Sequence, residues 1–152
     1  MINNDIIVRD DVTMITISNV SDNKSIMGEI LKRLLSMDMP VDIVDYHNNY
    51  KGSRLTILVE NSGILRVTSA VGMFKEKIKG ILCDIYCLNT SVTIKSKSTP
   101  MEDASTIMSE LDKNGVELYH MYSGLCGITI VINEAYTDRV CSILEKAFGK
   151  RN

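Results

Sequence analysis

The sequence contains few side chains that could bind a metal ion or act as a nucleophile. It has four cysteines and two histidines, and no two cysteines form the Cys-x-x-Cys pair found in many zinc sites and dithiol centres. His47 and His120 lie far from any metal-ligand spacing. We therefore expect no metal site, no cofactor and no disulfide, and we interpret the thiols as buried and reduced. These thiols belong to Cys83, Cys87, Cys126 and Cys141.

The sequence also lacks the elements of a phosphoryl-transfer site. It contains no glycine-rich phosphate loop and no pairing of carboxylates with a lysine suited to that chemistry. His120 has no catalytic partner nearby in the sequence, so we interpret it as a solvent-facing or core histidine. We expect a protein that is not an enzyme.

Composition limits the remaining functions. With 152 residues, 45% of them hydrophobic, the chain can bury a core as one compact domain or as two small ones. The net charge of −2, with both signs interspersed, argues against nucleic acid or an acidic membrane surface as a partner. No apolar run approaches the roughly 20 residues that a membrane span requires, and no signal peptide is visible, which predicts a cytoplasmic protein.

The elements that would position any site occur twice along the chain. Thr16-Ile17 is echoed by Thr93-Ile94, and the apolar positions of the following helix are echoed at the same offset. These positions are Met27, Ile30, Leu31 and Leu34, matched by Ala104, Ile107, Met108 and Leu111. A fixed offset across a strand and a helix predicts a duplicated supersecondary unit.

The first copy reads as β-α-β-β-α-β. Alternation predicts strands over residues 12–18, 41–46, 54–60 and 81–87, with helices over residues 26–35 and 64–78. Asn61-Ser62 is predicted to cap the second helix.

The second copy lacks its last strand. Strands are predicted over residues 91–96, 116–122 and 126–133. One helix should run from Thr99-Pro100 to about Lys113, where Asn114-Gly115 closes it, and another should end the chain. Ile6-Ile7-Val8 is an apolar strand without a neighbour, so we predict that it fills the open sheet edge. The predicted domains are residues 10–88, and residues 89–152 together with 1–9.

Three strings carry a resemblance to a known family. They are Thr16-Ile17-Ser18-Asn19-Val20-Ser21-Asp22, Met39-Pro40-Val41-Asp42-Ile43-Val44 and the segment from Val116 through Phe148. In order and spacing they resemble the regulatory region of bacterial aspartokinase, a tandem pair of ACT domains that also occurs as a free-standing beta subunit. The resemblance covers nearly the whole chain.

The resemblance implies an α+β fold of two interlocked ferredoxin-like units, with helices on one face of the sheet. It implies a homodimer built from four such units, which binds lysine, threonine or both at unit interfaces. It also implies that inhibition passes to an aspartate kinase domain, which in this case would be a separate chain.

The physical chemistry of a helix start suits such an effector. An α-carboxylate prefers the free N–H groups at a helix N-terminus, as residues 19–27 could offer, and an ammonium group prefers a carboxylate such as Asp22 or Asp42. The resemblance assigns ligand contacts to Asp22, Ser25, Met27, Val41 and Asp42, and to Ser123 on the facing unit. Asp22 could equally be only a helix cap, and Ser123 only a turn residue.

Three departures from the family pattern concern the same pocket. The family's Asp-x-Pro-Gly loop reads Asp22-Asn23-Lys24-Ser25, Tyr46 replaces a strand glutamine, and Glu117 replaces an asparagine. Without the glycine, a ligand cannot approach the backbone as closely. Two functions stay open: an allosteric amino-acid-binding regulatory protein, and an ACT-type interaction and dimerisation module that has lost ligand binding.

Overall fold

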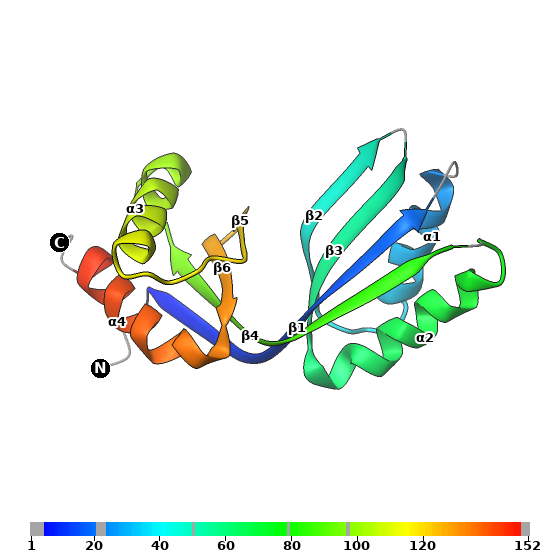
Figure 1. Ribbon diagram of the computed structural model, residues 1–152, viewed down its shortest axis with the longest axis horizontal. Helices are drawn as coiled ribbons and strands as arrows, with labels where there is room; N and C mark the ends of the chain where they lie inside the picture. The colour runs from blue at the N-terminus through cyan, green and yellow to red at the C-terminus, as the bar shows by residue number, and fades with distance from the viewer. Residues whose placement is uncertain (1–4, 21–23, 50, 79, 97, 150–152) are drawn as a thin grey trace. The chain divides into compact units, whose positions relative to one another are not determined.

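The structure, a computed structural model, describes residues 5–20, 24–49, 51–78, 80–96 and 98–149 (Figure 1). Its contacts divide the chain into two compact units. We call residues 12–87 the first unit, and residues 1–11 with 88–152 the second unit. None of the described helices is long and apolar enough to cross a membrane.

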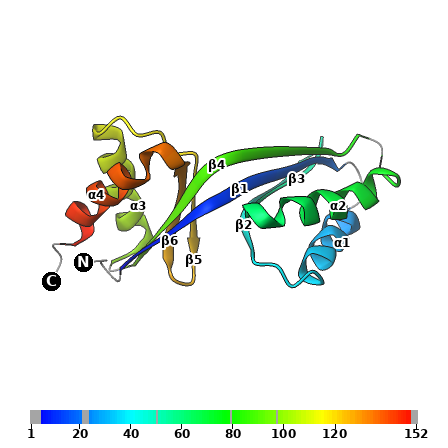
Figure 2. The ribbon, with the colours of Figure 1, turned by 90° about the horizontal axis from the view of Figure 1, so that it is seen from below.

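The first unit has the predicted β-α-β-β-α-β order. β3 pairs antiparallel with both β1 and β2, and α1 and α2 lie over the same face of the sheet (Figures 1 and 2). Its elements are the second part of β1 (Ile6–Val20), α1 (Lys24–Leu35), β2 (Val41–Asn49), β3 (Gly52–Glu60), the 3-10 helix η1 (Asn61–Gly63), α2 (Ile64–Lys75) and the first part of β4 (Leu82–Lys95).

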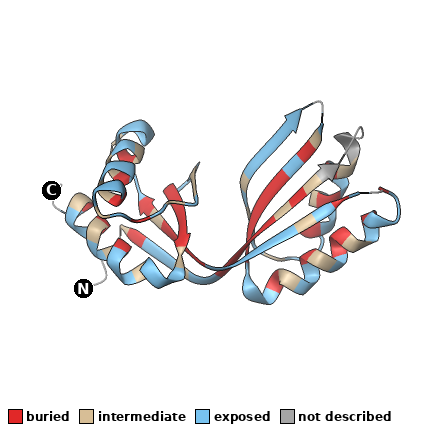
Figure 3. Ribbon diagram, viewed as in Figure 1, coloured by how far each residue is buried: buried red, intermediate tan, exposed pale blue. Residues whose placement is uncertain are grey.

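The core of the first unit lies between this sheet face and its two helices (Figure 3). Alternate residues of β1 and β3 point toward the helices because strand side chains alternate between faces. The helices contribute apolar residues spaced three and four apart. The buried set includes Ile15, Ile17, Leu55, Ile57, Val59, Met27, Ile30, Leu34, Val67, Val71 and Phe74.

The second unit repeats the same plan with a strand taken from the N-terminus. The strand order of the whole sheet is β2-β3-β1-β4-β6-β5, so β1 borders β4 and closes the edge that the second copy leaves open. The remaining elements are α3 (Pro100–Lys113), β5 (His120–Gly124), β6 (Gly127–Asn133), the 3-10 helix η2 (Glu134–Tyr136) and α4 (Thr137–Phe148). The predicted fold class, two interlocked ferredoxin-like units, is confirmed.

The N-terminal strand belongs to the core of the second unit. Ile6 is only 7% exposed and packs in the same apolar cluster as Val92 and Ile130. The backbone N–H of Lys95 donates to the carbonyl of Asp5 at 2.8 Å. The N-terminal strand is therefore part of the second unit rather than a free tail.

The repeat also extends to polar pairs. The hydroxyls of Thr16 and Thr56 lie 3.1 Å apart in the first unit, and those of Thr93 and Thr129 lie 2.8 Å apart in the second. Ile15 and Ile17 face the helices, so Thr16 between them faces away. Each unit thus has one cross-strand threonine pair at the matching register.

The ends of α3 are those that the sequence predicts. Thr99 is the N-cap and forms a reciprocal capping box with Glu102. At the other end Gly115 has φ +64°, and the N–H of Val116 donates to the carbonyl of Leu111 at 3.0 Å, as in a Schellman motif. Because Val116 completes this motif, the predicted strand does not begin there. β5 starts at His120.

The predicted breaks in β1 and β4 are absent. Both strands run on across the boundary between the units, where the sequence indicates two short strands in each case. At this boundary each strand contains one residue with left-handed backbone, Asp11 at φ +54° and Leu88 at φ +64°. A leucine in this region is unusual because its Cβ crowds the backbone.

The predicted cap of the second helix is also wrong. Residues Asn61–Gly63 form a 3-10 turn, and α2 begins at Ile64 without a side-chain cap. The amide oxygen of Asn61 instead accepts a hydrogen bond from the hydroxyl of Thr13 on β1.

Candidate functional site

The residues that the resemblance assigns to the ligand in the first unit have different environments. Asp22 lies outside the described residues, and Ser25 is the second residue of α1. Met27 is 2% exposed, and the half-buried Val41 packs against the same core. Met27 and Val41 are thus core residues.

The other two predicted residues of this unit lie on β2. Asp42 is half-buried and pairs with Leu58, while Val41 pairs with Val59 on the helix side. Tyr46 is 49% exposed and pairs with Leu55. Strand alternation therefore places Asp42 on the face opposite Val41. The structure brings Met27 and Val41 together and separates Asp42 from them.

Glu117 and Ser123 belong to the second unit. Glu117 is exposed in the segment between α3 and β5. Ser123 is exposed on β5 and pairs with Ile128 of β6. The ligand roles of all these residues stay predictions.

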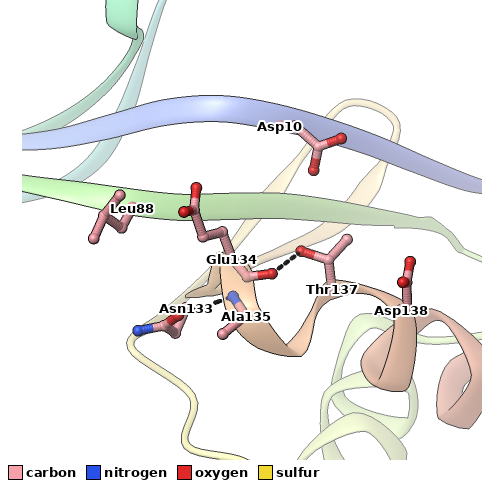
Figure 4. A pocket seen from close by; sticks show the side chains of 7 residues that line it. All are labelled: Asp10, Leu88, Asn133, Glu134, Ala135, Thr137 and Asp138. Atoms are coloured by element: carbon pink, nitrogen blue, oxygen red, sulfur yellow. Dashed lines mark hydrogen bonds between the residues drawn. The ribbon is translucent and has the colours of Figure 1, made fainter.

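A hollow of about 530 Å³ in the second unit was not predicted (Figure 4). It lies where β6 leads through η2 into α4, below Asp10 of β1. The residues that line it are Asp10, Leu88, Asn133, Glu134, Ala135, Thr137 and Asp138. Asp10 and Asp138 are far apart in the sequence, and their proximity depends on the N-terminal strand, so no local pattern could have revealed the hollow.

Hydroxyl groups connect the strands beside this hollow to α4. Thr90 donates to a carboxylate oxygen of Asp10 at 3.2 Å, and its hydroxyl lies 2.8 Å from that of Thr137. The hydroxyl of Thr137 also lies 2.8 Å from the carbonyl oxygen of Glu134, to which it can donate a hydrogen bond. These contacts fix the start of α4 against the N-terminal strand.

Three carboxylates around the hollow make it electronegative. Burial raises the pKa of the nearby Cys141 thiol, and the negative charges of Glu145, Asp138 and Asp10 raise this pKa further. Such a hollow favours a cationic group over a carboxylate. Among the described residues, no group of three or more His, Cys, Asp and Glu side chains could hold a metal ion.

The four thiols are free, and the prediction that all are buried is wrong for two of them. Cys87 and Cys126 are exposed, whereas Cys83 and Cys141 are partly buried. Burial also raises the pKa of Cys83, with Asp84 adding to the rise and Lys75 opposing it.

We expect the exposed thiols to react faster at pH 8 than Cys83 and Cys141, because burial lowers both the thiolate fraction and the access of the partly buried pair. The rate of labelling by iodoacetamide, followed by mass spectrometry of peptides, measures this order. Equal labelling rates for all four cysteines in the native protein would contradict the assignment of two exposed and two partly buried thiols.

The raised pKa values of Cys83 and Cys141 also affect stability. They stabilise the native state below the ordinary thiol pKa of 9.0, and this contribution is lost as the pH rises through the pKa values of the native state.

Comparisons with known proteins give a result at the level of structure. No family model and no curated protein matches the sequence. A chain in a structure of aspartokinase alpha and beta subunits is 17% identical to this one, and the match covers 95% of this chain and 97% of that chain at a TM-score of 0.80. The ligand-free regulatory subunit of aspartate kinase from Thermus thermophilus is 16% identical, with coverages of 94% and 96% and a TM-score of 0.81.

A longer protein shows the same likeness over part of its length. The aspartate kinase of Clostridium acetobutylicum is 15% identical, with a TM-score of 0.69, and 96% of this chain covers 34% of that one. By contrast, the regulatory subunits are covered almost completely. The chain therefore has, over nearly its whole length, the fold of the free-standing regulatory subunits of aspartate kinase.

Proposed function

We propose that this chain is a non-catalytic regulatory protein that binds an amino acid of the lysine or threonine class and controls a separate aspartate kinase chain. The observation that carries the proposal is the near-complete mutual coverage with regulatory subunits of aspartate kinase. In this proposal the protein acts as a homodimer, and it provides feedback control of the biosynthesis of aspartate-derived amino acids.

The local chemistry of the first unit supports an effector at the start of α1. The first turn of α1 contains no acidic residue, so α1 supplies no carboxylate of its own there. The partial positive charge of a helix N-terminus favours an anion, and the effector's α-carboxylate would supply it. Of the two carboxylates assigned to the ammonium group, Asp22 precedes α1 by two positions in the sequence, whereas Asp42 lies on the face of β2 opposite the helices. Asp22 would therefore contribute the negative charge for the ammonium group.

A second function is favoured by one observation. Asp42 lies on the face of β2 opposite Val41, and Met27 is already buried in the core. The separation of Asp42 from Val41 and Met27 is what we expect of a protein that has lost its effector pocket. The alternative is an interaction and dimerisation module without a small ligand.

Thermal unfolding with lysine and threonine, singly and together, separates the two functions. A ligand at about 100 times its dissociation constant stabilises the native state by about 2.7 kcal/mol, so we expect the Tm to rise by several degrees. D-lysine and D-threonine serve as ligand controls.

Two variants test the contact with the ammonium group. Asp22→Asn should remove most of the shift, because it removes the charge and keeps the shape. Asp42→Asn, on the face of β2 opposite the helices, should keep the shift. If neither amino acid changes the Tm of the intact protein, the interaction module is the better description.

A further inference from the structure

The start of α3 in the second unit contains a buried carboxylate. Asp103 is 1% exposed, and each of its carboxylate oxygens accepts a hydrogen bond from a serine. The hydroxyl of Ser96 donates to Oδ2 at 2.9 Å and shares its proton with the carbonyl oxygen of Ser98 at 2.8 Å, and the hydroxyl of Ser98 donates to Oδ1 at 2.6 Å. A carboxylate with this burial and these donors, in the first turn of a helix, has the surroundings that a bound anion would require.

The free N–H groups at this helix start are also largely satisfied from within the chain. The N–H of Thr99 donates to the carboxylate of Glu102 at 3.2 Å, and the N–H of Glu102 donates to the hydroxyl of Thr99 at 3.3 Å. Pro100 occupies the first helical position and has no N–H. The first four backbone N–H groups of a helix usually lack an acceptor within the helix. At the start of α3, two of these four have an acceptor and a third position, Pro100, has no N–H.

The equivalent helix of the first unit differs at the same positions. By the offset that aligns Ile30 with Ile107, Asp103 corresponds to Ile26. Ile26 is half-buried and packs against the core of the first unit. The first turn of α1 contains no acidic residue, whereas that of α3 contains Glu102 and Asp103. Within the described residues, the two copies thus differ in whether the first turn of the helix contains a carboxylate.

We propose that the side-chain carboxylate of Asp103 occupies the position at the start of α3 where the α-carboxylate of an amino acid would otherwise bind. The second unit then binds no amino acid at this helix start. Ligand recognition at a helix start is then confined to the first unit. This inference rests on the proposed function where it concerns the effector, but the occupancy by Asp103 can be tested without any effector.

The first test removes the carboxylate of Asp103 by mutation and supplies another carboxylate from solution. Asp103→Ala removes the carboxylate, and sodium formate supplies it as a separate ion. We expect formate to raise the Tm of Asp103→Ala by a few degrees more than sodium chloride at equal ionic strength, and to have no such effect on the intact protein. Asp112→Ala, at an exposed aspartate near the end of the same helix, is the matched control.

Two outcomes of this test are decisive. An equal response to formate in Asp103→Ala, Asp112→Ala and the intact protein overturns the proposal, because no carboxylate position has then been opened. If Asp103→Ala is unfolded in chloride, formate must restore its circular dichroism spectrum, and failure to do so overturns the proposal as well. Asp103→Asn, which fills the position without charge, should respond no more than the intact protein.

The second test uses lysine and threonine as probes on the intact protein. Backbone amide shifts of residues 98–103 should stay unchanged at saturating amino acid, while shifts elsewhere report binding. Shifts at Glu102 and Asp103 as large as any in the protein would overturn the proposal. If no amide shifts anywhere, the proposed effector function fails, and the formate experiment still decides the role of Asp103.

Discussion

Replacing Gly127 with alanine should destabilise the second unit much more than replacing Gly124, the other glycine of the same hairpin, with alanine. Gly127 has φ +141°, and a Cβ built there would lie 2.0 Å from the carbonyl oxygen of Ile94 and 2.9 Å from the N of Ser96. Both contacts are with the backbone of β4 and its end, so no side-chain rotation can relieve them. We expect a loss of at least about 3 kcal/mol in the free energy of unfolding.

Chemical denaturation followed by circular dichroism measures this loss, and Gly124→Ala is the matched control. Gly124 pairs directly with Gly127 across the same hairpin, and a Cβ there meets nothing within 4 Å. Its replacement should change the stability by less than about 1 kcal/mol. Similar losses in the two variants would show that β6 does not approach β4 as closely as described.

Shortening Ile6 to alanine should unfold or greatly weaken the second unit, although the residue lies near the start of the chain. Ile6 is 7% exposed in a core formed otherwise by residues after position 88. Isoleucine to alanine in a packed core costs about 2–5 kcal/mol, from lost burial and the remaining cavity. Hydrogen exchange of the β6 amides should accelerate accordingly.

Ile7→Ala is the control for this prediction, since Ile7 is 42% exposed and follows Ile6 directly. It should lose much less stability. Deleting residues 1–8 should exceed the effect of Ile6→Ala, because the edge of β4 then also loses its strand partner. A shortened protein as stable as the full chain would contradict the assignment of the N-terminal strand to the second unit.

The proposed asymmetry between the two helix starts bears on how many effector molecules one chain can bind. In the second unit, Ser96, Ser98 and Asp103 form a closed set of hydrogen bonds. In the first unit, the first turn of α1 as described, from Lys24 onward, contains no acidic residue. A duplicated unit can therefore have the same fold in both copies while only one retains a place for an external carboxylate.

The sequence by itself determined those features that depend on neighbouring residues. The capping box of Thr99 and Glu102 and the glycine stop at Gly115 follow from short-range backbone hydrogen bonding, so the limits of α3 were predicted correctly. The alternation around Ile15 and Ile17 and the helical spacing of Ile30 and Leu34 determined the core faces in the same way. The repeat and the missing last strand predicted where the N-terminal segment belongs.

Only the tertiary structure decided features that depend on contacts between distant segments. The sequence predicts that Asn61 caps a helix, yet its amide oxygen accepts a hydrogen bond from the hydroxyl of Thr13, 48 positions away. Asp10 reads as part of a strand break, yet Thr90 hydrogen-bonds to it and β1 continues.

The same reason applies to the candidate sites. Burial of Met27, the face of Asp42 and the hydroxyl partners of Asp103 are set by packing and register across the sheet or loop. Residue type alone leaves open whether a polar group meets solvent, a ligand or another part of the chain. That choice is made when the strands pair, because each buried donor and acceptor must then find a partner.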